Sequence, residues 1–247
     1  MFSLVGWQDG AGHAALAATA GIFDDHITQN GNLIIIGSEN KLMGGIACIG
    51  AGGIQAELQS PSLRRMNPYQ ISPLVLGIVP TANHNFEMDY SNAIPLDPNE
   101  GLEAWHLGAA VTEHTILAWL CDTPQTPVSG KILHVRYTFA AIATVLNAWI
   151  GGPIVLPTLL PTGKYTVVGA RCFAAGAVGF RFNPVGDPSR PGGIAQQALT
   201  DQNVIPFRDG YMGKWFELDT NQLPSLQLAT SAAGNIAGSG DLDILIP

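Results

Sequence analysis

Short apolar runs separated by turn-forming residues dominate the second half of the sequence. Residues 131–139 (KILHVRYTF) show the pattern most clearly, because two faces of alternating residues can be read along the segment. A period of two is typical of a β-strand. Further strands are predicted at residues 115–121, 154–156, 164–170, 178–183, 214–218, 225–230 and 242–246. Residues 141–149 fit a continuing strand or a short helix, since periodicity alone does not separate the two.

The number and spacing of these segments predict the fold class. Eight or nine short strands follow residue 101, and no convincing amphipathic helix interrupts them. We therefore expect an all-β fold, a jelly-roll type antiparallel β-sandwich in which two sheets pack face to face. No segment repeats at a fixed period, which disfavours propellers and solenoids.

The first hundred residues have a different texture. Residues 1–55 are rich in Gly and Ala and contain one clear strand, 32–37 (NLIIIG), before a glycine run. Residues 56–100 hold many prolines, which favour long loops. We therefore expect an extended N-terminal arm (1–55), a Pro-rich loop region (56–100) and a sandwich core (101–247). At about 3.3 Å per residue, an extended arm would reach neighbouring subunits.

The composition favours a protein that associates with copies of itself. Hydrophobic residues make up 47% of the chain and charged residues only 12%, about half of the usual charged share. A weakly charged, partly apolar surface is stabilised when neighbouring copies bury it. No apolar stretch approaches the roughly 18–20 residues of a spanning helix, so no membrane span is predicted, while contact with an internal membrane stays open.

The charge balance argues against direct nucleic-acid binding. Eleven Lys and Arg residues against nineteen Asp and Glu residues give a net charge of −8. Proteins that coat nucleic acid neutralise phosphates with clustered Arg and Lys. Arg64 and Arg65 form the only adjacent cationic pair, which is too small for a basic patch.

No motif of residues predicts catalysis, a cofactor or a metal. The glycine run 44–53 lacks the phosphate-loop pattern GxxxxGK[ST]. The six histidines contain no HxxH or HExxH pair, and we expect no shared metal between His106 and His114, which are eight residues apart. Asp241 and Asp243 would point to the same face of a strand, where we expect solvated acids and not a calcium ion. A glycosidase pair far apart in sequence stays open.

The cysteines and aromatic residues are expected to have structural roles. Three cysteines at positions 48, 121 and 172 lack metal or redox spacing, so we expect reduced, buried side chains. Four tryptophans fall in or beside strands, at positions 105, 119, 149 and 215. We expect them to fill the core, although aromatic residues on an open sheet face would indicate sugar binding.

Several segments together resemble a known group of proteins. They are residues 60–65 (SPSLRR), 117–122 (LAWLCD), 131–137 (KILHVRY), 160–169 (LPTGKYTVVG), 189–193 (SRPGG), 213–217 (GKWFE), 223–226 (LPSL) and 242–246 (LDILI). In this order they resemble virion structural proteins of tailless or environmental bacteriophages, similar to jelly-roll capsid proteins. The likeness covers residues 57–66 and 115–246, and it lies in turn and strand signatures rather than in chemistry.

The resemblance implies a capsid subunit, in the first instance the major one, that assembles into a viral shell without catalysis. Its partners would be copies of itself and other virion proteins, and its location would be the virion, assembled in the host cytoplasm. Whether the chain holds a single or a double jelly roll stays open. The alternative is a carbohydrate-binding β-sandwich, as in a lectin or a virion spike or decoration protein. The candidate interface residues are Arg64, Arg65, Asp187, Arg190, Leu242 and Ile244.

Overall fold

β-Strands form most of the chain in the computed structural model, 62% against 2% helix, in several antiparallel sheets with a sandwich-like arrangement. The all-β antiparallel class predicted from the sequence is thereby confirmed. The structure describes residues 1–24, 27–49, 55–64, 68–71, 73–75, 87–88, 93–108, 114–123, 125–157, 160–196, 207–230 and 232–246. No helix in these described ranges is long and apolar enough to cross a membrane.

The chain divides into two compact units. We call Leu4–Pro124 with Leu146–Ala148 the N-terminal unit, and Met1–Ser3, Gln125–Val145 and Trp149–Pro247 the C-terminal unit.

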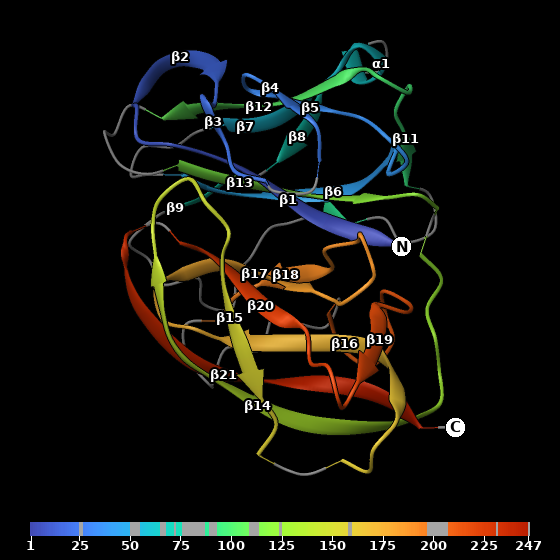
Figure 1. The fold of residues 1–247 in the computed structure, drawn as a ribbon. Coiled ribbons are helices and arrows are strands. Elements are labelled where there is room, and N and C mark those ends of the chain that lie inside the picture. Colours follow the sequence, from blue (N-terminus) through green and yellow to red (C-terminus); the bar gives the residue numbers. More distant parts are fainter. Residues whose placement is uncertain are drawn as a thin grey trace. The chain divides into compact units, whose positions relative to one another are not determined.

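The C-terminal unit consists of eight strands in one hydrogen-bonded path (Figure 1). The strands are β14 (Lys131–Thr144), β15 (Ile150–Val155), β16 (Lys164–Phe173), β17 (Ala177–Asn183), β18 (Gly192–Ile194), β19 (Phe216–Asp219), β20 (Ser225–Thr230) and β21 (Gly234–Ile246). Their order in space is β18-β17-β20-β15-β14-β21-β16-β19. The longest pairing joins β14 to β21, from Lys131 opposite Ile246 to Thr144 opposite Gly234. Residues 141–144 therefore continue the strand that the sequence left undecided.

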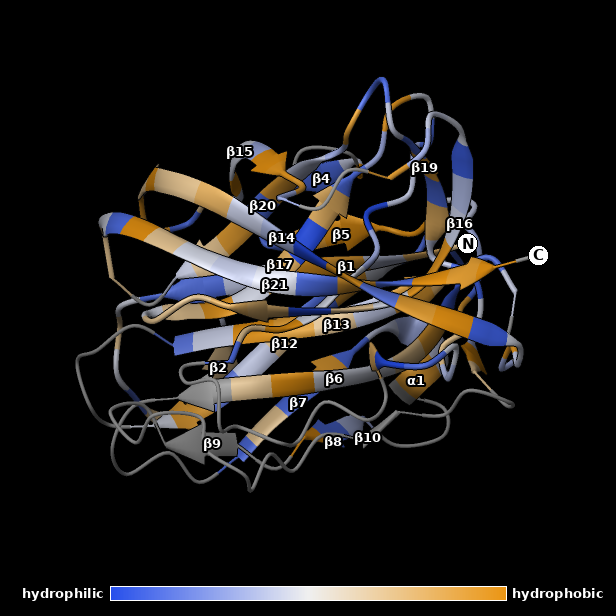
Figure 2. Cartoon of the chain, turned by 90° about the horizontal axis from the view of Figure 1, so that it is seen from below, coloured by the Kyte–Doolittle hydropathy of each residue, from blue (hydrophilic) through white to orange (hydrophobic). Residues whose placement is uncertain are grey.

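Aromatic contacts show that this path folds over on itself. Tyr137 and Phe139 of β14 are buried, on the face that the alternating pattern of the strand assigns to the core. The Tyr137 ring packs edge-on against Phe182 of β17, with ring centroids 5.8 Å apart. Since β14 and β17 are not neighbours in the strand order, the two halves of the path face each other across an apolar layer. In Figure 2, the colours along β14 and β21 switch between hydrophilic and hydrophobic residues.

The described residues of the N-terminal unit form two sheets and one short helix. Its elements are β1 (Phe2–Asp9), β2 (His13–Ala18), β3 (Gly21–Ile22), β4 (Gln29–Asn30), β5 (Leu33–Ile35), β6 (Lys41–Ile49), β7 (Gln55–Gln59), α1 (Pro61–Arg64), β8 (Tyr69–Ile71), β9 (Pro73–Val75), β10 (Glu87–Met88), β11 (Ile94–Pro95), β12 (Gly101–Gly108) and β13 (His114–Cys121). One sheet has the order β10-β6-β13-β1-β3, with β9 and β11 also paired to β6. The other has the order β4-β5-β12-β7-β8, with β2 also paired to β12.

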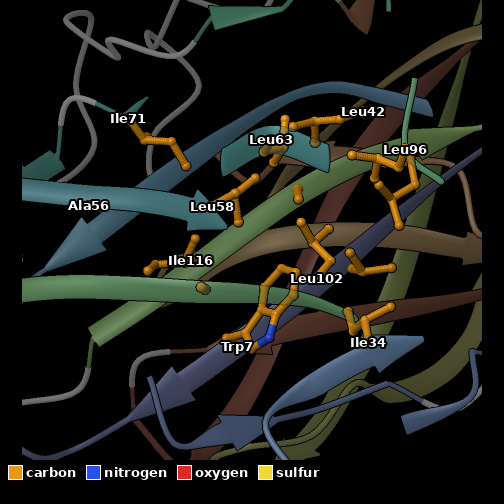
Figure 3. Packing of buried hydrophobic residues seen from close by; sticks show 14 of the residues in the cluster. Trp7, Ile34, Leu42, Ala56, Leu58, Leu63, Ile71, Leu96, Leu102 and Ile116 are labelled. Carbon is orange, nitrogen blue, oxygen red and sulfur yellow. The ribbon is translucent and has the colours of Figure 1, made fainter. Parts of the chain in front are cut away.

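Apolar side chains from both sheets form the core of the N-terminal unit (Figure 3). Trp7 of β1 and Ile116 of β13 come from the first sheet, and Leu58 of β7 and Leu102 of β12 come from the second. The buried indole of Trp7 donates a hydrogen bond to the carbonyl oxygen of Asn32 at 3.1 Å, which satisfies its polar atom. The two sheets therefore pack face to face as a sandwich.

The two units share one strand order. Eight strands of the N-terminal unit correspond, in chain order, to β14 to β21 of the C-terminal unit. They are β1, β2, β6, β7, β8, β10, β12 and β13. The path β10-β6-β13-β1 matches β19-β16-β21-β14, and the path β8-β7-β12-β2 matches β18-β17-β20-β15. The N-terminal unit also has five added strands: β3, β4 and β5 between the second and third positions of this order, β9 between the fifth and sixth, and β11 between the sixth and seventh. The sequence shows no repeat, so the likeness of the units lies in topology alone.

The first hundred residues differ from the prediction. Residues 1–55 do not form a separate arm, because β1 to β6 pair within the sheets and β1 is buried along its whole length. Residues 56–100 are not only loop, since Leu63 and Leu96 enter the core. Two of the prolines sit where strand and helix tolerate them: Pro61 begins α1, and Pro95 ends the two-residue strand β11.

Candidate functional sites

The loop between β17 and β18 holds two of the predicted interface residues. The Asp187 carboxylate accepts hydrogen bonds from the backbone amide and the hydroxyl of Ser189, at 2.8 and 2.7 Å. Nη1 of Arg190 donates to the carbonyl oxygens of residues 187, 188 and 189 at 3.0 to 3.1 Å. The loop is therefore shaped by its own side chains, and beside it Val185 is 55% exposed.

The structure places Leu242 and Ile244 in the interior and not at the predicted interface. Both side chains are fully buried. They belong to β21, which lies between β14 and β16 and so has no free edge along this part. Their side chains pack inside their own unit and are closed to a partner. Of the remaining candidates, Arg64 ends α1, and Arg65 lies outside the described residues.

The opposite face of β21 carries a row of ion pairs. Asp241 accepts a hydrogen bond from Nε of Arg136 on β14 at 2.8 Å, and it also pairs with Arg171 on β16. Burial opposes ionisation of Asp241, but the hydrogen bonds and charges of the two arginines outweigh it and lower the pKa of this carboxyl. Asp241 is therefore a buried, paired acid and not the solvated one expected from the sequence.

Asp243, two residues further along, is enclosed in the same way. Nε and Nη2 of Arg208 donate to its two oxygens, each at 2.7 Å. Nδ1 of His134 lies 2.8 Å from Oδ1, and the amide of Asp209 donates to Oδ2 at 2.8 Å. His134, Asp209 and Asp243 bring potential ligand atoms within 4.8 Å of one another. The guanidinium beside them already neutralises the buried carboxylate, so this group does not suit a cation.

A second group lies in the N-terminal unit and was missed by sequence reasoning. The rings of His106 and His114 lie 4.4 Å apart between centroids, and those of His13 and His106 lie 4.5 Å apart. Asp9 lies beside them, with Oδ2 3.5 Å from Nε2 of His13. Sequence spacing gave no sign of this cluster, because its members come from four strands in two sheets.

Hydrogen bonds and burial fix the charge states in this cluster. The carboxylate of Asp9 accepts hydrogen bonds from the amides of Ala11 and Ala20, at 2.6 and 2.9 Å. Burial opposes its ionisation, but these bonds and the nearby histidines lower the pKa of Asp9. Burial, reinforced by the neighbouring His114, lowers the pKa of His106 to about 4. At neutral pH, Asp9 is thus an anion and His106 is an uncharged imidazole.

The tryptophans mainly have the core role that the sequence predicted. Trp119, Trp149 and Trp215 are buried, so they form no open face for stacking a sugar. Trp105 is half-buried and donates a hydrogen bond to Glu103 at 2.6 Å. Tyr211, in contrast, is 46% exposed.

Two of the three cysteines are buried and free, as predicted. Burial raises the pKa of Cys121 to about 11 and that of Cys172 to about 12. Neither side chain is therefore a thiolate nucleophile at neutral pH. The side chain of Cys48 lies outside the described part.

Comparisons of the chain with models of protein families, with curated proteins and with solved structures found no match. The functional assignment therefore rests on the topology and the side-chain geometry of the chain itself.

Proposed function

We propose that the chain is a capsid subunit with two jelly rolls in tandem, which assembles with copies of itself into the shell of a virus. The observation that carries this proposal is the strand order that recurs in both units. The recurring order also favours two jelly rolls over one, a choice that the sequence left open.

The argument for jelly rolls follows from the order of the eight strands. Numbered from one to eight in each unit, the strands form the paths 1-8-3-6 and 2-7-4-5. The chain therefore runs back and forth between two facing sets of four strands. We interpret this connectivity as two interlocked Greek keys, the arrangement expected of a jelly roll. Jelly rolls are frequent in viral capsid and lectin domains, so the topology supports the proposal.

The surface of the C-terminal unit supports assembly. Several large apolar side chains are between 40% and 57% exposed, namely Leu133, Val145, Val155, Val185 and Tyr211. Charged residues make up only 12% of the chain. Contacts between many symmetric copies would bury such side chains, and repetition makes modest interfaces stable.

The buried charges support a structural and not a catalytic role. Asp241 and Asp243 are the most enclosed acids among the described residues of the C-terminal unit, and arginines neutralise both. A glycosidase would need two carboxyl groups facing a substrate, and these two face their own arginines. We therefore assign no catalytic step to this face. The net charge of −8 favours contact with protein neighbours over contact with a genome.

Electron microscopy of the purified full chain in negative stain tests the proposal. Closed shells, sheets or regular rings are expected. Val155→Asp, which places a charge on a side chain that is 57% exposed, should reduce their number. Gln222→Glu adds the same charge on an exposed turn without removing apolar surface and should leave assembly unchanged.

Dispersed particles of monomer size under all salt conditions would contradict the proposal. Saturable binding of a glycan by such monomers would favour the lectin alternative, which shares the jelly-roll topology.

A further inference from the structure

We infer that Asp9, His13 and His106 form a binding site for a divalent transition-metal ion, and that zinc suits this donor set best. Two imidazoles and one carboxylate are ordinary zinc ligands. This inference concerns the N-terminal unit and does not depend on the role in a capsid.

The strand pattern directs the cluster into the space between the two sheets. Asp9 follows the core residue Trp7 by two positions in β1, and His106 follows the core residue Ala104 by two positions in β12. Because side chains alternate along a strand, residues two apart share a face. Both polar side chains therefore continue the inward face of their strands beyond the apolar core. They come from opposite sheets and meet at one end of the sandwich.

His13 reaches the same point from β2. This strand pairs with β12, where His13 lies opposite Gly108 and Ala17 lies opposite His106. The register shifts between residues 106 and 108, which indicates a bulge in β12 at this place. Bulges redirect side chains and are frequent beside functional sites.

The donor atoms lie close to the spacing that a metal requires. One ligand atom from each of Asp9, His13 and His106 lies within 4.8 Å of the other two. Nε2 of His13 and Oδ2 of Asp9 are 3.5 Å apart. Zinc bonds of about 2.0 to 2.1 Å place tetrahedral ligands about 3.3 Å apart. The Asp9–His13 pair is near this distance already, and the ligand atom of His106 lies within 4.8 Å of both.

Contacts outside the cluster orient the ligands. Oγ1 of Thr19 lies 2.9 Å from Nδ1 of His106. When Nδ1 donates to this hydroxyl, Nε2 carries the lone pair that a metal needs, and a bound metal would replace the contact of Nε2 with the carbonyl oxygen of Ala11 at 3.4 Å. The amides of Ala11 and Ala20 hold the carboxylate of Asp9. Metal-bound histidines and carboxylates typically have such hydrogen-bond partners.

The cluster contains a polar atom that a metal would satisfy. Nε2 of His13 is buried and, apart from the 3.5 Å approach of Oδ2 of Asp9, has no hydrogen-bond partner within the described structure. A buried polar atom without a hydrogen bond is costly. Three protein ligands leave a fourth position, which water fills in zinc sites of this type.

The other group of possible ligands provides a natural comparison. Around Asp243, Arg208 occupies both carboxylate oxygens and also lies 2.9 Å from Nδ1 of His134. No arginine or lysine is recorded in contact with Asp9, His13 or His106 among the described residues. His134→Ala is therefore a matched control for a histidine substitution.

Metal titration of the chelator-treated full chain tests the inference. Zinc added in competition with a chromophoric chelator should bind at one ion per chain in the wild type. His13→Ala should weaken binding by more than about 100-fold, beyond the upper effect of losing an outer partner. Thr19→Val keeps all ligands and should weaken binding about 10- to 100-fold. His134→Ala should bind as the wild type does.

Circular dichroism confirms that each variant is folded, and Co²⁺ in place of zinc reports ligand geometry through its visible absorption. A tetrahedral cobalt spectrum that is lost in His13→Ala supports the site. Absence of saturable zinc binding by the folded wild type would overturn the inference. Equal zinc affinity in wild type and His13→Ala, or loss of binding in His134→Ala alone, would overturn it as well.

Discussion

Asp243 and Arg208 form a two-point ion pair in the C-terminal unit, with Nε to Oδ2 and Nη2 to Oδ1 both at 2.7 Å. The carboxylate is fully buried, and the arginine side chain is 13% exposed. Burying two charges costs solvation energy, which paired hydrogen bonds in good geometry offset. The ion pair therefore holds the segment that carries Arg208 beside β21.

Removal of the buried charge should be strongly destabilising. Asp243→Asn leaves the guanidinium of Arg208 without its partner, and we expect a loss of about 3 to 5 kcal/mol in the free energy of unfolding. Urea unfolding followed by tryptophan fluorescence measures this quantity. Glu217→Gln breaks the exposed pair with Lys214 and serves as the control, with an expected loss below about 1 kcal/mol. Equal effects of the two substitutions would contradict this description of Asp243.

Asp241 should make stability depend on pH in acid. Its pKa in the folded chain lies below the unfolded value of about 3.9, so the folded state binds fewer protons. Its contribution is therefore complete above the unfolded pKa and is lost as the pH falls through the folded pKa. We expect Asp241→Asn to be less stable than the wild type at pH 7, with the difference shrinking towards pH 3. A difference that stays constant over this range would show that the charge of Asp241 has no such role.

Gly240 should not tolerate a side chain. A Cβ at this position would lie 2.1 Å from the carbonyl oxygen of Arg171 and 2.4 Å from the Tyr137 ring. We expect Gly240→Ala to cost about 1 to 3 kcal/mol, the usual range for overpacking. Gly234→Ala, in the same strand, would meet nothing within 4 Å and should be nearly neutral. Thermal unfolding of both variants provides the comparison, and similar melting temperatures would refute the close packing.

The two buried thiols should be protected from modification. Cys121 and Cys172 are fully buried, and burial raises the pKa of both. We expect no labelling of either residue by iodoacetamide at pH 8 in the native chain, and complete labelling in urea. Peptide mass spectrometry identifies each position. Rapid labelling of Cys172 in the native state would show that its part of the core opens.

The strands of the C-terminal unit could be predicted from the sequence because their side chains carry the signal. Residues 131–139 alternate, and bulky residues such as Tyr137 and Phe139 mark the buried face. The strand at residues 225–230 coincides with β20. Such segments combine β-propensity with a clear period of two.

The N-terminal sandwich was not predicted as a unit, although its strand β13 was expected from residues 115–121, because several of its other strands lack those residues. β2 reads HAALAA, and β6 contains two consecutive glycines, so neither has a strong β-propensity. Pairing with stronger neighbours fixes them in the sheets, as β6 pairs with β13 over seven positions. The similar order of the two units is a property of these pairings, which local sequence does not encode.

The histidine cluster escaped prediction for the same reason. His106 and His114 are eight residues apart in sequence. Only the folding of two facing sheets brings their ring centroids to 4.4 Å from each other. Asp9 and His13 join them through the turn between β1 and β2. One signal was available in the sequence. His106 and His114 each lie two positions from a core residue of their strand, and residues two apart share a face.

The mass of the purified full chain, measured by light scattering over a range of concentrations, tests the proposed assembly most directly. We predict defined species many times heavier than the 26.0 kDa chain, in proportions that rise with concentration. A single species of 26.0 kDa at every concentration and salt level would contradict the proposal that this chain builds a shell.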